Sequence, residues 1–207
     1  MKQTIRIVAI IVTLLSLCSC TPKQIDRNDP SQTVSGFIDS IKSYDFTEIK
    51  SYLDSVPNSK TQGLLIDIYT DENYVALYKK AAKKAKYTVL SVDENESGAT
   101  ATISATYYDL KTGYSTAILS IAAMAMEDEE LMQQMLDEKA DVTHFIPQCM
   151  QKLIDDGSLK TEEKTLTITL IKDEAQNFVV KTDDNAKTLI TSGTSDAIAN
   201  ITQNIAQ

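Results

Sequence analysis

The sequence predicts an α+β fold in which helices pack on an antiparallel sheet, and two observations support this class. Apolar residues recur at helical spacing in residues 30–53 and 72–86, whereas they alternate with polar residues in residues 87–108 and 164–172. The alternating segments are paired across short polar turns, as in β-hairpins. Helices grouped before hairpins, with no regular strand–helix alternation, are typical of the α+β class.

Three helices are predicted before the first strand. Asp29-Pro30 favours a helix start because Asp caps a helix N-terminus and Pro suits the first helical position. The apolar residues that follow at helical spacing are Val34, Phe37, Ile38, Ile41 and Tyr44. Asp45 begins a second, short helix, and a third is predicted over residues 72–86. We interpret its lysines as a solvated face, and the alternative is a site for an anionic wall polymer; they are Lys79, Lys80, Lys83, Lys84 and Lys86.

Two hairpins with a helical insertion between them are predicted to follow. The first pairs residues 87–92 with residues 100–108 across a polar turn that ends at Gly98, where glycine is free to adopt a positive φ. The second joins residues 164–172 to a last short strand at Phe178, Val179 and Val180. One face of the sheet is threonine-rich, so we expect it to be wet while the other packs on the first helix.

The insertion is predicted over about residues 112–157. Within it, residues 116–126 are almost all Ala, Ile, Leu and Met, which predicts a buried helix. Met124, Met126, Met132 and Met135 are expected in the core of the insertion, and the alternative is that they form an adaptable surface for a partner. Residues 184–207 are expected to form a weakly helical C-terminal tail.

The first twenty residues have the features of a leader peptide. Lys2 and Arg6 are followed by an apolar run at residues 7–17, which is too short to span a bilayer comfortably but has the length of a signal-peptide core. The run ends in Leu17-Cys18-Ser19-Cys20, which resembles the bacterial lipobox. The alternatives are an ordinary signal peptide cleaved near Ser19 and a buried N-terminal helix.

The lipobox resemblance implies removal of residues 1–19 and lipid attachment at Cys20. Because the segment that follows is polar, residues 20–28 are expected to be a tether, and residues 29–183 the folded domain. The expected location is the extracytoplasmic face of the cell membrane. Cleavage would remove Lys2 and Arg6 but no acid, so the mature chain would be more acidic than the net charge of −9 of the whole chain. Such a chain is expected to bind the membrane through acyl chains and not through a basic patch.

The composition also narrows the possible partners and cofactors. A sequence pI near 4.6 argues against a nucleic-acid partner, which requires a basic face. His144 is the only histidine, and Cys149 is the only cysteine after Cys20, so neither a zinc site nor an internal disulfide is expected. Residues 93–98 resemble the start of a calcium loop, but Ser104 stands where the closing Glu would be. We therefore expect no metal and no cofactor.

The order of elements resembles the cystatin-like cone, the fold of nuclear transport factor 2 and ketosteroid isomerase. It is more closely similar to a family of lipoproteins of Gram-positive bacteria that carry this domain. The residues that carry the resemblance are Asp29-Pro30, Val34, Phe37, Asp45-Phe46, Ile49, Tyr52, Leu53, Tyr87, residues 90–92, Gly98, Ala101, Ile103, Asp109-Leu110 and residues 165–170. The resemblance implies N-terminal helices on a curved antiparallel sheet. It implies no activity, because none is assigned to these lipoproteins.

The tyrosines are the most distinctive candidates for a site, since all nine lie between Tyr44 and Tyr114. Tyr52, Tyr107 and Tyr108 are the ligand-binding candidates, because each could lie near the mouth of a cone. Asp109 is the only carboxylate candidate for proton transfer there, but an Asp at a strand end more often caps a helix. The competing interpretation is that most of the tyrosines lie at the edge of the core.

Three functions follow from these observations. The first is a non-enzymatic surface lipoprotein that binds another envelope component. The second is a protein that holds a small ligand inside the cone, and the third is a cone-fold enzyme of the isomerase or dehydratase type. An interior filled by Phe37, Ile41, Ile103 and Ile168 would remove the second and third. The oligomeric state stays open.

Overall fold

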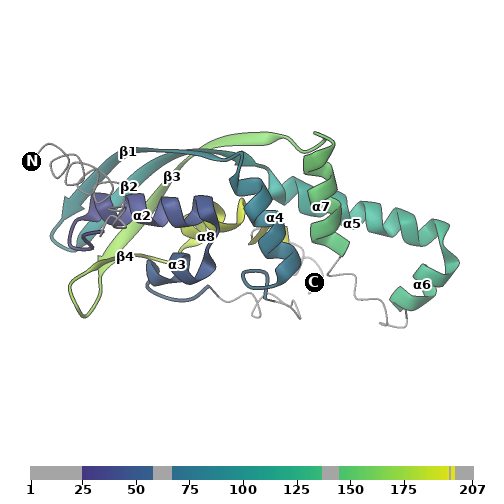
Figure 1. Ribbon diagram of the computed structural model, residues 1–207, viewed down its shortest axis with the longest axis horizontal. Helices are drawn as coiled ribbons and strands as arrows, with labels where there is room; N and C mark the ends of the chain where they lie inside the picture. The colour runs from purple at the N-terminus through teal and green to yellow at the C-terminus, as the bar shows by residue number, and fades with distance from the viewer. Residues whose placement is uncertain (1–24, 58–66, 137–144, 196, 199–207) are drawn as a thin grey trace, which may run out of the picture.

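The computed structural model describes residues 25–57, 67–136, 145–195 and 197–198, and it confirms the α+β class (Figure 1). The leader, Cys20 and His144 lie outside these residues. In chain order the elements are α2 Pro30–Ser43, α3 Phe46–Ser51, α4 Glu72–Ala82, β1 Lys86–Asn95, β2 Gly98–Tyr108, α5 Leu110–Glu127, α6 Glu129–Leu136, α7 Phe145–Asp155, β3 Thr161–Lys172, β4 Phe178–Val180 and α8 Asp184–Thr191. The helix predicted over residues 72–86 ends at Ala82, because the chain turns there and enters β1.

The four strands form one antiparallel sheet in the order β1-β2-β3-β4. Ala101 pairs with Ile168 and Ile103 with Leu166, so the apolar residues of β2 and β3 share one face. That face is buried, and α2, α4 and α8 all contact the strands. The threonines of the opposite face are half-buried or exposed, as expected for a wet face.

Aspartates start several of the helices by capping them. Asp29 accepts hydrogen bonds from the backbone N–H groups of Ser31 and Gln32, with Pro30 at the first helical position. The side-chain hydrogen bond from Gln32 is the main cause that lowers the pKa of the Asp29 carboxyl; burial opposes it, and the backbone hydrogen bonds from Ser31 and Gln32 lower the pKa further. Asp45 caps α3 in the same way. Local chemistry therefore sets these helix starts.

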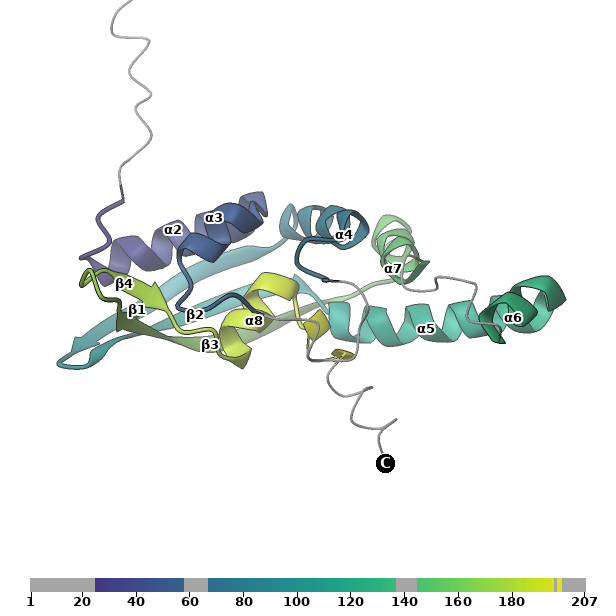
Figure 2. The ribbon, with the colours of Figure 1, turned by 90° about the horizontal axis from the view of Figure 1, so that it is seen from below.

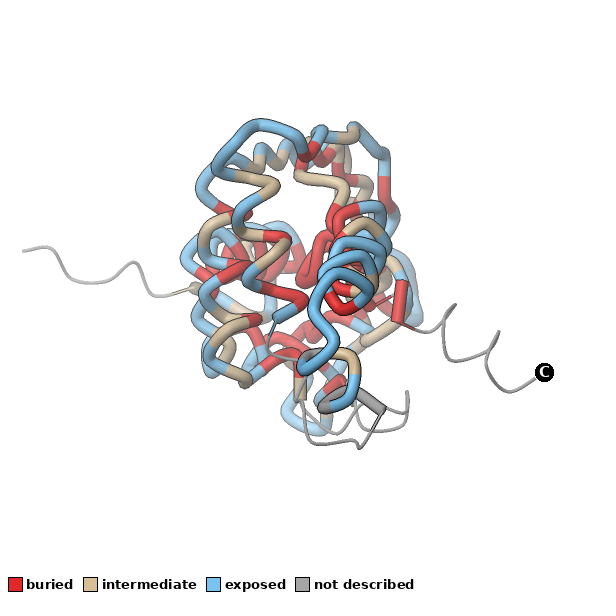
Figure 3. Tube along the Cα trace, turned by 90° about the vertical axis from the view of Figure 1, so that its right-hand side faces the viewer, coloured by how far each residue is buried: buried red, intermediate tan, exposed pale blue. Residues whose placement is uncertain are grey.

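The space between α2 and the sheet is filled with side chains. Phe37 and Ile41 of α2 meet Ile103 of β2 and Ile168 of β3 in one core, and all four are buried. Figure 3 shows the buried residues gathered inside the body. The interior that the sequence left open as a possible ligand cavity is occupied here by the protein's own core.

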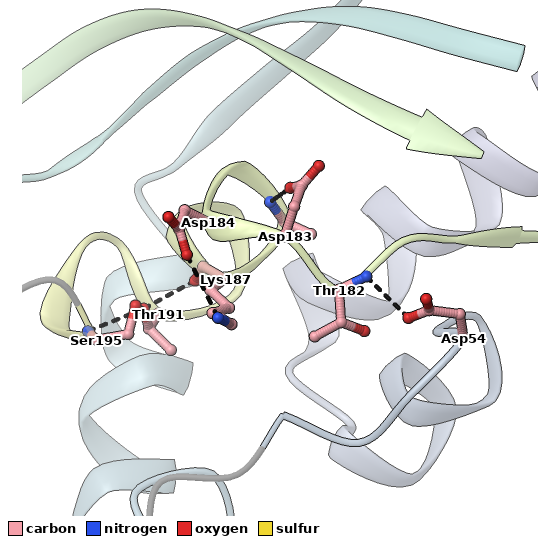
Figure 4. A network of polar contacts seen from close by, with 8 residues as sticks. Asp54, Thr182, Asp183, Asp184, Lys187, Thr191 and Ser195 are labelled. Atoms are coloured by element: carbon pink, nitrogen blue, oxygen red, sulfur yellow. Dashed lines mark hydrogen bonds and ion pairs between the residues drawn. The ribbon is translucent and has the colours of Figure 1, made fainter. Parts of the chain in front are cut away.

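The helix α8 belongs to this core. Ala186, Leu189 and Ile190 are buried and join the same apolar cluster. Asp183 caps the helix by accepting from the N–H of Ala186 at 2.9 Å, and Asp54 accepts from the N–H of Thr182 at the same distance (Figure 4). Burial acts to raise the pKa of Asp54, but the hydrogen bonds from Thr182 and Ser55 outweigh it and hold the pKa below its ordinary value.

Residues 25–28, the end of the expected tether, lie against the body. The carbonyl of Arg27 accepts from the N–H of Phe178 at 2.7 Å, and its guanidinium donates to the Ser51 carbonyl. The guanidinium carbon also lies 3.9 Å from the centre of the Tyr52 ring. Gly36 leaves room for that ring, since a Cβ there would lie 2.2 Å from the Tyr52 hydroxyl oxygen. The chain is thus held on the body from just before α2.

Candidate functional site

The three candidate tyrosines do not converge on one mouth. Tyr52 ends α3, and its carbonyl accepts from the N–H of Val180 in β4 at 2.7 Å. Val180 pairs with Leu170, which pairs with Ala99 at the start of β2. Tyr107 lies eight residues farther along that strand, or about 26 Å at 3.3 Å per residue. Tyr52 and Tyr107 therefore lie at opposite ends of the sheet.

Tyr107 and Tyr108 are neighbours in β2 and so point to opposite faces of the sheet. Tyr107 is buried on the face covered by helices, 1% exposed, whereas Tyr108 is half-buried on the threonine-rich face. Of these two, Tyr107 is the one on the face that packs in the core.

Asp109 caps α5. Its carboxylate accepts hydrogen bonds from the backbone N–H of Thr112 at 3.0 Å and from the Thr112 hydroxyl. A carboxylate engaged in this way satisfies the first turn of a helix, which is the capping role expected of an Asp at a strand end.

Replacing Asp109 tests the capping role. We expect Asp109→Ala to lower the free energy of unfolding by about 1 kcal/mol, because it leaves a helix N–H without its acceptor. Asp109→Asn keeps an acceptor oxygen and is expected to lose only a small part of that stability. Urea unfolding of the two variants measures the difference. Equal losses would show that the negative charge, and not the cap, is what matters at this position.

A cluster of buried tyrosines lies under α4 and was not singled out from the sequence. The Tyr44 and Tyr78 ring centres are 5.0 Å apart, and those of Tyr74 and Tyr78 are 6.1 Å apart. The three side chains are at most 2% exposed. Their hydroxyls form no hydrogen bond of good geometry within the described residues, although Tyr114 and Thr194 bring polar groups beside Tyr74 and Tyr78. The feature of the sequence that points to this cluster is the spacing of Tyr74 and Tyr78, which lie one helical turn apart.

Burial controls the chemistry of this cluster. It raises the pKa of Tyr44, Tyr74 and Tyr78 above the ordinary tyrosine value, and the neighbouring tyrosines and acids add to the effect. The three phenols therefore stay protonated at neutral pH. They can donate hydrogen bonds, but they cannot act as phenolate bases.

A groove lies between α3 and α4 at the surface. Its volume is about 520 Å³, and its walls include Tyr44, Phe46 and Val75, with Glu48 and Lys79 beside them. The lining combines two acids, Asp45 and Glu48, and one lysine with aromatic and aliphatic surface. Elsewhere in the described part of the chain, no three His, Cys, Asp or Glu residues are grouped so that they could hold a metal ion.

The helix α5 corrects the expectation of a buried helix at residues 116–126. Its buried side packs on α7 and on the segment after it, and Gly113 leaves room there, since a Cβ would lie 3.2 Å from the side chain of Leu159 and 3.5 Å from that of Met150 in α7. The opposite side is open: Leu119 is 70% exposed, Met124 45% and Met126 78%. Met124 and Met126 are thus not in the core of the insertion, because α7 covers only one side of the helix.

The exposed side of α5 carries a continuous apolar row, which we call the α5 stripe. It consists of Leu119, Ala122, Ala123 and Met126, at the i, i+3, i+4 and i+7 positions of one helix face. Four acidic residues, Glu127 to Glu130, follow at once and are all exposed. Figures 1 and 2 show α5 and α6 projecting from the end of the body opposite the N-terminal end of α2.

An apolar helix face in water is unusual. A helix that is apolar on all sides is normally buried, and large exposed apolar patches mark interaction surfaces. The α5 stripe is therefore the strongest candidate functional site in the described residues. We call α5 and α6 together the arm.

Comparisons with protein-family models, with curated proteins and with solved structures find no match to this chain. Within the described residues, no helix has the length and apolar character needed to cross a membrane.

Proposed function

We propose that the chain is a lipoprotein anchored to the extracytoplasmic face of the cell membrane through Cys20, and that it acts as a non-enzymatic binding module through its arm. The observation that carries the binding role is the exposed α5 stripe, an apolar helix face at the end of the body opposite the N-terminal segment. We further propose that the fold is a variant of the cystatin-like cone, as in the Gram-positive lipoproteins that the sequence resembles, with the arm as its insertion.

The N-terminal contacts support a presentation role. Ile25 is five residues beyond Cys20, a distance that an extended chain spans in at most about 18 Å. Because residues 25–28 are held on the body, the anchor would keep the N-terminal end of α2 close to the lipid headgroups. The arm lies at the other end and would stay clear of the attachment point.

The core supports a function without catalysis. Phe37, Ile41, Ile103 and Ile168 fill the space where the cone-fold alternatives need a ligand or a substrate. Asp109 is engaged as a helix cap. The small-ligand and isomerase alternatives are therefore left without an interior site in the described part of the chain.

The lipid anchor is tested by replacing its cysteine. We expect Cys20→Ser to move most of the protein from the membrane fraction to the soluble fraction, because this one residue would carry all the acyl chains. Cys18→Ser is the matched control and should remain in the membrane. The readouts are detergent-phase partitioning and the mass of the N-terminal peptide. A Cys20→Ser protein that remains membrane-bound like the wild type would overturn the anchor.

A further inference from the structure

We propose that the α5 stripe is occupied by a second copy of this chain, with the two α5 helices antiparallel across a two-fold axis. The inference rests on the proposed lipid anchor and names the partner of the same surface. Its three supports are the shape of the stripe, the charges at its two ends and the position of the tether.

The shape of the stripe is self-complementary in the antiparallel direction. Its small residues, Ala122 and Ala123, lie in the middle, and its large ones, Leu119 and Met126, lie at the ends. A two-fold axis between Ala122 and Ala123 places Leu119 of one copy against Met126 of the other. The alanines allow the helix axes to approach to about 8 Å, the short end of the usual range.

The charges at the two ends of the stripe distinguish the two directions of pairing. Lys111 is exposed and lies eight residues before Leu119, on the same side of the helix. The exposed acids Glu127 to Glu130 lie at the other end. Antiparallel pairing brings Lys111 of each copy toward the acids of the other. Parallel pairing would set the two acidic clusters side by side, where like charges repel.

The anchor explains how so small a surface can suffice. Four side chains, two of them alanine, fall short of the roughly 800 Å² per partner of a stable interface. Confinement of both copies to one membrane surface raises their effective concentration, so a weak contact is enough to form a dimer. A two-fold axis along the membrane normal leaves an anchored N-terminal end at each end of the pair.

Insertion of the stripe into the bilayer is the less favoured alternative. The four acids beside Met126 would have to approach the anionic headgroups, and the chain as a whole carries a net charge of −9. A partner protein of a different kind is an outcome that the experiment detects.

Cysteine cross-linking in the membrane tests the pairing. The full chain, with its leader, is expressed in a bacterial host with Cys149→Ser as background, since Cys149 is the free thiol of the folded part. Ala123→Cys places a thiol beside the two-fold axis. Ser120→Cys is the matched control, exposed on the same helix but off the stripe. Membranes are oxidised with copper phenanthroline, and products are resolved by mass.

We expect at least ten times more dimer from Ala123→Cys than from Ser120→Cys. Co-expressed Leu119→Cys and Met126→Cys chains should cross-link to each other, while Leu119→Cys alone gives little dimer. Lys111→Glu should reduce the Ala123→Cys dimer several-fold.

Three results would overturn the pairing. The first is an Ala123→Cys dimer yield equal to that of Ser120→Cys, and the second is a dominant product whose mass is not twice that of the chain. The third is a Leu119→Cys dimer as abundant as the cross-link between Leu119→Cys and Met126→Cys chains, which would show parallel helices. In each of these cases the proposed anchored module stands as long as the chain fractionates with the membrane. Loss of the chain from the membrane fraction would overturn both proposals.

Discussion

Gly98→Ala is expected to destabilise the fold by about 3 kcal/mol or more. Gly98 begins β2 with a φ of 156°, and a Cβ built on it would lie 2.2 Å from the carbonyl oxygen of Leu170 in β3. That oxygen belongs to the backbone of a paired strand, so it cannot rotate away as a side chain would. The β2–β3 pairing must open at this end to admit a methyl group. Urea unfolding of the purified protein measures the loss.

Gly157 provides the matched control for this prediction. It also has a positive φ, 75°, but no atom lies within 4 Å of a Cβ built on it. Gly157→Ala should therefore cost only about 1 kcal/mol, the ordinary penalty for alanine in that conformation. If the two substitutions cost the same, the close approach of Gly98 to Leu170 is not what constrains position 98.

Alkaline pH is expected to unfold the protein steeply. Burial raises the pKa of Tyr44, Tyr74 and Tyr78 in the folded state, whereas in the unfolded chain these groups ionise near pH 10. Their contribution to stability is complete below pH 10 and is lost as the pH rises toward the folded-state pKa values. Over that range each of these groups lowers the free energy of unfolding by about 1.4 kcal/mol per pH unit, so the three together contribute about 4 kcal/mol per pH unit. Burial also raises the pKa of Tyr52, Tyr87 and Tyr114, and these groups add to the slope.

Two measurements check the alkaline prediction. Urea unfolding at pH values from 8 to about 12 gives the slope, and Tyr78→Phe should reduce it by about 1.4 kcal/mol per pH unit, because it removes one ionising group. Absorbance titration should show these phenols ionising together with unfolding. Ionisation near pH 10 in a chain that is still folded would mean that the cluster is open to solvent.

The contrast between the tyrosine cluster and the arm separates structural from functional features. Tyr44, Tyr74 and Tyr78 are enclosed, so a partner cannot reach them without opening the core. Leu119 and Met126 are in contact with water on a projecting helix, where burial by a partner would be favourable. A partner can therefore cover the apolar surface of the arm without disrupting the fold.

Much of the local structure could be predicted from the residues alone. Asp29 and Asp45 cap helices as predicted, and Asp109 caps α5 at the end of β2. The alternation in residues 100–108 put Tyr107 on the buried face of the sheet. These features depend on hydrogen bonds and on the two-residue period of a strand, which act between neighbours in the chain.

The sequence by itself determined the fold class, the helix caps and the polarity of each sheet face, because all of these depend on local spacing. Only the tertiary structure decided that α5 is covered on one side, that Tyr52 and Tyr107 lie at opposite ends of the sheet, and that Tyr44 joins the tyrosines of α4. The sequence of an apolar helix does not reveal whether one neighbouring element or several pack against it. What covers each face depends on contacts between distant segments, and residue spacing carries no record of those contacts.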